Sequence, residues 1–148
     1  MKISKKCQYA LRAIFELAWR KTNEPIKIRS IARAQGISPR FTEIILNDLK
    51  HAGLVDSKRG KDGGYILAKD ANAITVGEII EHIQGHIAFM PDLTIKKSDT
   101  ALLGEHTFRK LWQEINKAVS GVCFNKTIAD LIKYEETKRQ RDIPNYSI

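Results

Sequence analysis

The sequence has few cysteines and no long apolar run. Its 148 residues include only two cysteines, Cys7 and Cys123. Two thiols in one chain cannot supply four thiolate ligands to a zinc ion or an iron–sulfur cluster. No stretch approaches the roughly 20 apolar residues that a membrane-spanning helix needs. Arg12 and Glu16 interrupt the place where the apolar core of a signal peptide would lie, so we expect a cytoplasmic protein with free thiols and no membrane partner.

Catalytic motifs are also missing. The four histidines are scattered and show no HExxH spacing, and no serine lies in a nucleophile elbow. Gly60, Gly63 and Gly64 belong to an expected hairpin and do not precede a helix, as a phosphate-binding loop would require. We therefore expect that the protein is not an enzyme.

The charge is strongly basic in one half of the chain. The sequence holds 25 Lys and Arg against 17 Asp and Glu, for a formal net charge of +8. Residues 1–67 contain 14 of the basic and 6 of the acidic residues, whereas residues 68–148 contain 11 of each. Such a bias indicates a face that binds a polyanion, and at this point both nucleic acid and an anionic membrane surface fit.

Three helices are predicted in the first 52 residues. The first runs from Ser4, an expected N-cap, to about Arg20, and the second spans Ile28–Gln35. Gly36 suits the left-handed position that ends the second helix, and Ser38-Pro39 begins a third that runs to about Ala52. The apolar side of the third helix is expected to consist of Phe41, Ile44, Ile45 and Leu49. This order predicts a helix-turn-helix, although an ordinary helical hairpin in a core has the same pattern.

A short hairpin follows. Residues 54–57 and 65–67 read as two strands, and the Asp-Gly and Gly-Gly pairs between them favour a bend with positive φ. The hairpin tip has three cations, Lys58, Arg59 and Lys61. A solvated hairpin would also accept these residues. Directly after a helix-turn-helix, a basic wing that approaches a phosphate backbone is the preferred interpretation.

The C-terminal half predicts three more helices. A capping box at residues 75–78 begins one that runs to about Gly85, and residues 86–104 are expected to be irregular. A longer helix starts near Glu105 and is expected to end at Gly121, and a second capping box at residues 127–130 begins the last helix, whose tail after Glu135 should fray. The long helix has an apolar seam of Phe108, Leu111, Trp112, Ile115 and Val119.

Several of these segments together resemble one known family. The segments MKISKKCQYALRAIFELA, GISPRFTEIILNDLKHAGLV and SKRGKDGGY are similar to the Rrf2 family of bacterial transcription regulators, the IscR, NsrR and CymR type. The resemblance implies a mainly α-helical fold with a small β-wing, a winged helix-turn-helix in residues 1–85, an irregular sensor segment at 86–104, and a dimerisation helix with a C-terminal helix in 105–148. It also implies a homodimer that pairs through the seam.

The resemblance assigns a set of DNA-binding residues. They are Ser38, Arg40, Phe41, Glu43, Lys58, Arg59, Gly60 and Lys61. Glu43 could accept a hydrogen bond from cytosine, and Arg40 could bind guanine or phosphate. Arg59 would contact the minor groove or the backbone. Glu43 could equally be a surface residue paired with a cation, and Phe41 has no hydroxyl to offer to a phosphate.

The sensor segment departs from the family. Many members hold an iron–sulfur cluster on three cysteines there, but residues 86–106 contain none, so we expect no cluster and no metal site. His106 falls near the position of the last cluster cysteine, and Met90, Asp92 and Asp99 read as solvated loop residues. Cys7, whose neighbours Lys5 and Lys6 would favour a thiolate, is a possible redox thiol. Cys123 reads as a packed thiol.

The resulting hypothesis is a sequence-specific, double-stranded-DNA-binding transcription regulator, most simply a repressor. Two alternatives stay open. One is a protein-interaction regulator whose main partner is a metabolic enzyme and whose DNA binding is weak. The other keeps the DNA function and senses a small molecule in a cavity of the dimer.

Overall fold

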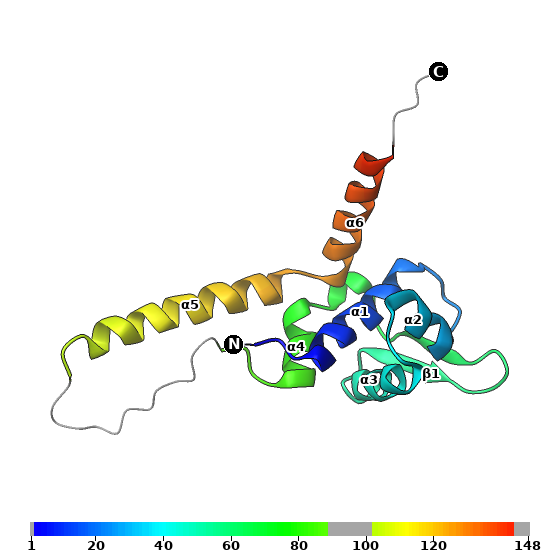
Figure 1. The fold of residues 1–148 in the computed structure, drawn as a ribbon, viewed down its shortest axis with the longest axis horizontal. Coiled ribbons are helices and arrows are strands. Elements are labelled where there is room, and N and C mark those ends of the chain that lie inside the picture. Colours follow the sequence, from blue (N-terminus) through cyan, green and yellow to red (C-terminus); the bar gives the residue numbers. More distant parts are fainter. Residues whose placement is uncertain (1, 89–101, 144–148) are drawn as a thin grey trace, which may run out of the picture.

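The computed structural model describes residues 2–88 and 102–143. Its elements are α1 (Lys5–Trp19), α2 (Ile28–Gln35), α3 (Pro39–His51), β1 (Val55–Lys58), β2 (Gly64–Leu67), the short 3-10 turn η1 (Ala71–Ala73), α4 (Val76–Gln84), α5 (Glu105–Asn125) and α6 (Ile128–Asp142). Helices α1 to α4 and the hairpin form one body, from which α5 extends as a rod and α6 projects in another direction (Figure 1). The predicted fold, mainly α-helical with a small β-wing, is confirmed. Within the described ranges, no helix has both the length and the apolar character needed to cross a membrane.

The predicted helix boundaries of the N-terminal half are confirmed. The Ser4 hydroxyl accepts a hydrogen bond from the Cys7 amide at 3.1 Å, and the Ser38 hydroxyl caps α3 in the same way. Gly36 has a φ of 62°, a left-handed conformation that side chains disfavour, and it ends α2. Helices α2 and α3 are therefore joined by the tight turn of a helix-turn-helix.

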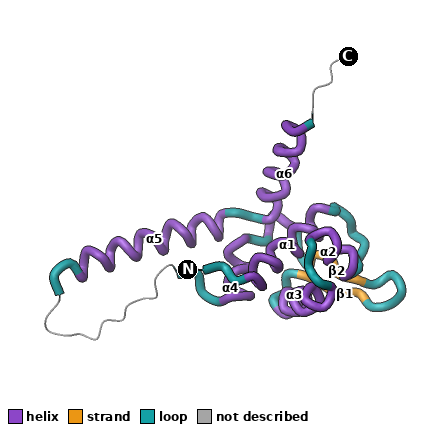
Figure 2. The backbone as a smooth tube through the Cα atoms, in the orientation of Figure 1, coloured by secondary structure: helices purple, strands orange, loops and turns teal. Residues whose placement is uncertain are grey.

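Strands β1 and β2 form an antiparallel hairpin directly after α3 (Figure 2). Their register pairs Val55 with Leu67 and Lys58 with Gly64. Ile26, just before α2, exchanges two backbone hydrogen bonds with Tyr65, at 2.8 and 2.9 Å. This extra pairing fastens the entrance of α2 to the hairpin, so the hairpin base and the helix-turn-helix are held as one unit.

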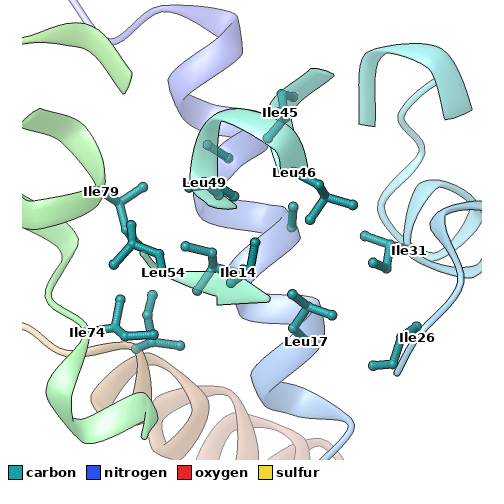
Figure 3. Packing of buried hydrophobic residues seen from close by; sticks show 14 of the residues in the cluster. Ile14, Leu17, Ile26, Ile31, Ile45, Leu46, Leu49, Leu54, Ile74 and Ile79 are labelled. Atoms are coloured by element: carbon teal, nitrogen blue, oxygen red, sulfur yellow. The ribbon is translucent and has the colours of Figure 1, made fainter. Parts of the chain in front are cut away.

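The main core surrounds α1. Figure 3 shows Ile14 and Leu17 of α1 among side chains from α2, α3, α4 and the strands. Burying each such side chain contributes about 1.5–3 kcal/mol. The predicted apolar side of α3 needs one correction, because Ile44 is 45% exposed while Leu46 is fully buried. The buried face of the helix is centred on positions 42, 45, 46 and 49, and Ile44 lies at its edge.

Two predicted ends in the C-terminal half are wrong. Helix α5 continues through Gly121 to Asn125, because one glycine inside a helix costs only about 1 kcal/mol relative to alanine. Helix α6 continues past Glu135 to Asp142. Its later turns are held against α1: Arg139 lies over the ring of Trp19 at 5.1 Å, and Glu136 forms an ion pair with Lys21.

The two predicted capping boxes have different outcomes. At the start of α6, Thr127 and Asp130 make both reciprocal hydrogen bonds, so that box is confirmed. At the start of α4, Thr75 accepts from the Glu78 amide at 3.1 Å. The Glu78 carboxylate binds Lys69 at 2.6 Å, so the second half of the expected box is replaced by an ion pair.

The predicted division of the chain at residues 85 and 105 stays a prediction. The packing adds one fact to it: α6 shares the main core with the N-terminal body. Ile128 of α6 is fully buried and Ile132 is nearly so, both within the cluster around α1. The first turns of α6 are therefore anchored in the body that presents the helix-turn-helix, and the rest of the helix projects from it.

Candidate nucleic-acid interface

The N-terminus of α3 presents polar groups to solvent. The Ser38 hydroxyl accepts from the Phe41 amide at 3.3 Å, and its own hydrogen stays available to donate to a ligand. Arg40, in the first turn, is exposed and forms no ion pair with any described residue. A helix N-terminus attracts anions, so this turn suits a phosphate.

Phe41 has a packing role. Its ring meets the ring of Tyr9 edge to face, with centroids 5.7 Å apart and an interplanar angle of 82°. The guanidinium of Arg12 lies over the Tyr9 ring at 5.7 Å. Phe41 is half-buried and belongs to the rim of the main core. This contact fastens the first turn of α3 to α1, and it sets the direction in which Ser38 and Arg40 point.

Glu43 is exposed on α3 and forms no ion pair with the described part of the chain. The alternative in which Glu43 pairs with a nearby cation is therefore not what the structure shows. Burial raises the pKa of Tyr65, and the negative charge of Glu43 raises that pKa further. Glu43 thus lies close to the base of the hairpin, with both carboxylate oxygens free to accept hydrogen bonds.

A groove of about 650 Å³ separates the hairpin loop from α2 and the end of α3. Its lining includes six cations and no carboxylate: Lys27, Arg29, Lys50, Lys58, Arg59 and Lys61. Three of these were predicted from the hairpin alone. The other three come from segments that only the fold brings beside the loop. We call this set the basic groove.

The hairpin loop has the backbone that its glycines require. Gly60 has a φ of 107°, and its carbonyl accepts from the Gly63 amide at 3.1 Å. A Cβ on Gly63 would clash with the carbonyl oxygen of Lys58. The tight loop therefore depends on glycine and holds the three wing cations at the edge of the basic groove.

The cations of the basic groove differ from several other cations of the chain in their ion pairing. Six Lys–carboxylate or Arg–carboxylate pairs form among the described residues: Lys6–Asp48, Arg20–Glu16, Lys21–Glu136, Lys69–Glu78, Arg109–Glu105 and Arg139–Glu135. No groove cation takes part in such a pair within that part of the chain. Lys50 instead donates to the Ser57 hydroxyl at 2.6 Å. Uncompensated positive charge gathered in one groove is the electrostatic pattern of a phosphate-binding surface.

The apolar seam on α5 is divided within a single chain. Phe108 and Leu111 are 58% and 42% exposed, whereas Val119 packs against the cluster that contains Cys7 and Ile80. Trp112 and Ile115 are half-buried. No residue of α5 is fully buried. The helix thus presents apolar side chains that the described part of the chain leaves exposed.

The physical reason for expecting a redox thiol at Cys7, a pKa lowered by neighbouring lysines, is not found in the structure. Cys7 is fully buried between α1 and α4, and burial raises its pKa, so the expected lowering by Lys5 and Lys6 is wrong. The Lys5 side chain is exposed, and Lys6 forms an ion pair with Asp48. Burial also raises the pKa of Cys123.

The residues considered as metal ligands do not gather into a site. His106 is exposed at the start of α5, and Met90, Asp92 and Asp99 lie outside the described residues. Among the side chains that the structure describes, no three His, Cys, Asp or Glu residues come together as metal ligands would.

Comparison with known proteins gives a consistent result. A family model described as "Rrf2: Iron-dependent Transcriptional regulator" matches residues 3–134. The HTH-type transcriptional regulator CymR of Bacillus subtilis is 35% identical over 140 residues, which cover 95% of this chain and 96% of CymR. The regulator IscR of Klebsiella pneumoniae is 30% identical over 138 residues, covering 92% of this chain and 82% of IscR.

The solved structures agree. The B. subtilis CymR structure, described as that of a global cysteine regulator, superposes with a TM-score of 0.79 at 35% identity, covering 90% of this chain and 98% of that one. The structure of T. potens IscR has a TM-score of 0.73 at 32% identity, with 94% and 91% covered.

The residues of this chain do not fit the iron that the family description names. An iron–sulfur cluster requires mostly thiolate ligands, and the chain has two cysteines in all. One of them, Cys7 of α1, is enclosed by apolar side chains, most of which come from α4 and α5.

Proposed function

Because the chain belongs to the Rrf2 family of transcription regulators, we propose that it acts as a homodimer that sets two winged helix-turn-helix motifs on double-stranded DNA. As a member of this family it is a DNA-binding transcription regulator and not an enzyme. The dimer, the repressor role and the action in the cytoplasm, where bacterial DNA lies, are the proposed parts. A repressor would bind over a promoter and exclude polymerase.

One observation supports the DNA surface: six cations line the basic groove beside the recognition helix α3, and none of them is ion-paired with a described residue. In this proposal the groove cations bind phosphates along one strand. The first turn of α3, with Ser38 and Arg40, enters the major groove, where Glu43 accepts from a base. Arg59, at the hairpin tip, reaches a narrow groove or the backbone.

The uncovered apolar side of α5 supports the homodimer. Phe108, Leu111 and Val122 are all more than two-fifths exposed on this helix. A second copy related by a two-fold axis would cover them, and an antiparallel helix pair would then present the two recognition helices in a palindromic arrangement. The effector, a small molecule or a protein, stays a prediction.

Binding-site selection from a randomised duplex pool tests the DNA function. The wild-type protein should enrich a roughly palindromic sequence. Arg59→Ala should weaken binding to that sequence by roughly 1–3 kcal/mol, whereas Lys61→Ala, a phosphate contact, should weaken all sequences alike. Failure to enrich any sequence would refute sequence-specific binding.

Light scattering tests the homodimer. We expect a dimer at micromolar concentration, and Ile115→Asp should convert it to monomer because a carboxylate would be buried without a partner, at a cost of several kcal/mol. Glu114→Gln, on the neighbouring exposed position, is the matched control and should stay dimeric. A wild-type chain that is monomeric at this concentration would refute the proposal.

A further inference from the structure

Two segments that are far apart in the sequence are joined at the base of α5. The Val76 amide donates to the Lys126 carbonyl at 2.8 Å, and the Ile128 amide donates to the Ile74 carbonyl at 2.9 Å. These bonds form an antiparallel bridge between Thr75 and Thr127. The same two threonines are the N-caps of α4 and α6. The starts of both helices are thus tied to each other where α5 ends.

A close side-chain contact strengthens this junction. The ring of Phe124, in the last turn of α5, lies directly on Gly77 in the first turn of α4. A Cβ on Gly77 would be 2.7 Å from two ring atoms, which is too close for any real contact. The Phe124 ring can therefore keep its observed place against α4 only while position 77 has no side chain.

The rest of α5 has little anchorage of its own. None of its residues is fully buried, and Figure 1 shows its N-terminal half extending away from the body. Val119 and Cys123 touch the cluster between α1 and α4, and both lie in the C-terminal part of the helix. The direction of α5 is thus set by its last turns and by the junction.

Such a long helix amplifies small rotations. With 21 residues it is about 30 Å long, so turning it by about 6° at the junction moves its far end by about 3 Å. That displacement is close to the roughly 3.4 Å by which successive phosphates of one strand are spaced along the DNA axis. If α5 pairs with its copy, a small change at the junction shifts one recognition helix against the other by about one base pair.

We propose that the junction of residues 74–77 with residues 124–128 is the positioning element that sets the spacing between the two DNA half-sites. This inference rests on the homodimeric DNA binding proposed above. Val76 and Gly77 act through α5 and need not touch DNA. Their effect should therefore appear in the preferred spacing and not in the affinity for one half-site.

Val76→Pro removes one junction bond with little other change. Val76 is the first residue of α4, a position that favours proline because its amide has no partner within the helix. Thr75 has φ −94° and ψ 153°, an extended conformation that suits the residue before a proline. The variant therefore loses the bond to the Lys126 carbonyl while α4 can still form. Val76→Ala truncates the same side chain, keeps the amide, and is the matched control.

Gly77→Ala perturbs the side-chain packing of the junction and leaves its backbone hydrogen bonds in place. The new methyl group must displace the Phe124 ring, while alanine itself favours the helix. The double variant Gly77→Ala/Phe124→Ala removes the ring that is displaced. It should restore the wild-type spacing, which a merely unfolded α4 could not do.

The assay measures fluorescence anisotropy on duplexes that hold two half-sites separated by spacers of stepped length, with a single half-site as reference. The melting temperature and the mass by light scattering are followed for every variant. Wild type, Val76→Ala and the double variant should share one preferred spacer. Val76→Pro and Gly77→Ala should lose about ten- to hundredfold in affinity on that spacer, or prefer a neighbouring one, because both subunits can no longer engage together. Their half-site affinity should stay within about twofold.

Two results would overturn the inference in distinguishable ways. If wild type is dimeric with one preferred spacer and Val76→Pro keeps that preference, the junction does not set the spacing, and the proposed function stands. The same holds if half-site and full-site affinities fall in parallel while the protein remains folded. If wild type is dimeric but indifferent to the spacer, the inference fails and the homodimer stands. If wild type is monomeric, the proposed homodimer fails, and the inference fails with it.

Discussion

Arg29→Ala gives the sharpest test of the basic groove, because Arg29 is not in the wing and was not among the residues expected to bind DNA. It lies on the exposed side of α2 and lines the groove with Lys50 and the hairpin cations. It forms no ion pair with the described residues, so its removal leaves no carboxylate without a partner. Any effect on DNA binding should then come from a lost phosphate contact.

The expected magnitude follows from counterion release. Each neutralised phosphate contributes about 0.9 to the slope of log K against log salt. A dimer loses two Arg29 side chains, so the slope should become less steep by about 1.8. Between about 50 and about 200 mM salt, the loss of affinity should therefore be about tenfold smaller than in wild type.

The assay is fluorescence anisotropy over a series of salt concentrations, on a selected operator and on an unrelated duplex. Lys138→Ala is the matched control. It removes one exposed cation per chain from α6, which lies on the opposite side of α1 from α3 in Figure 1. Both variants change the net charge equally, so only a local contact can separate them.

The Arg29 result should be the same on both duplexes, because phosphate contacts do not read sequence. An unchanged slope in Arg29→Ala would show that the groove does not hold a phosphate there. Equal slopes in Arg29→Ala and Lys138→Ala, both less steep than wild type, would show that net charge alone drives binding. Either result refutes the assignment of the basic groove.

Three further outcomes follow from local physics. Lys21→Gly should raise the free energy of unfolding, measured by urea titration, by about 0.5–1 kcal/mol. Lys21 has a φ of 47°, a conformation that disfavours a side chain, and the exposed ion pair that it loses with Glu136 contributes little. Cys7 should not react with a thiol reagent until the protein is unfolded, since burial raises its pKa; rapid labelling in the folded Cys123→Ser variant would contradict this. Hydrogen bonds from Thr127 lower the pKa of Asp130, so its contribution to stability is present above the ordinary pKa of 3.8 and is lost as the pH falls through the lowered value. Asp130→Asn should therefore be less stable than wild type at pH 7, and thermal melts should show the difference shrinking in acid.

Local signals predicted most of the N-terminal half correctly. Ser4, Gly36 and Ser38 act through residues within a few positions in the chain, so their roles can be predicted without knowing the fold. The errors lie where a distant partner decides. Helix α6 continues past Glu135, and in its later turns Arg139 lies over the ring of Trp19, a residue more than a hundred positions earlier.

The candidate site shows the same limit. The wing cations were found because three of them occur together next to a glycine-rich turn. Lys27 and Arg29 looked like ordinary polar residues at the start of a short helix, and Lys50 like the end of another. Lys27 and Arg29 join the wing because Ile26 pairs with Tyr65 and brings the start of α2 against the hairpin, whereas Lys50 reaches it through its hydrogen bond to Ser57. Patterns in a single sequence do not reveal that residues 26 and 65 pair.

The charge excess of residues 1–67 therefore indicates which half of the chain binds an anion, but it does not identify the binding surface. Some of its cations are paired with carboxylates: Lys6 of α1 with Asp48 of α3, and Arg20 with Glu16 one turn earlier at the end of α1. The charges of the basic groove are not compensated in this way, because no carboxylate of a described residue lines that groove. An exposed ion pair contributes little to stability, and six neighbouring unpaired cations repel one another when no ligand is bound. A bound anion would offset this repulsion. A DNA strand has regularly spaced phosphates, so it can place several negative charges in one groove.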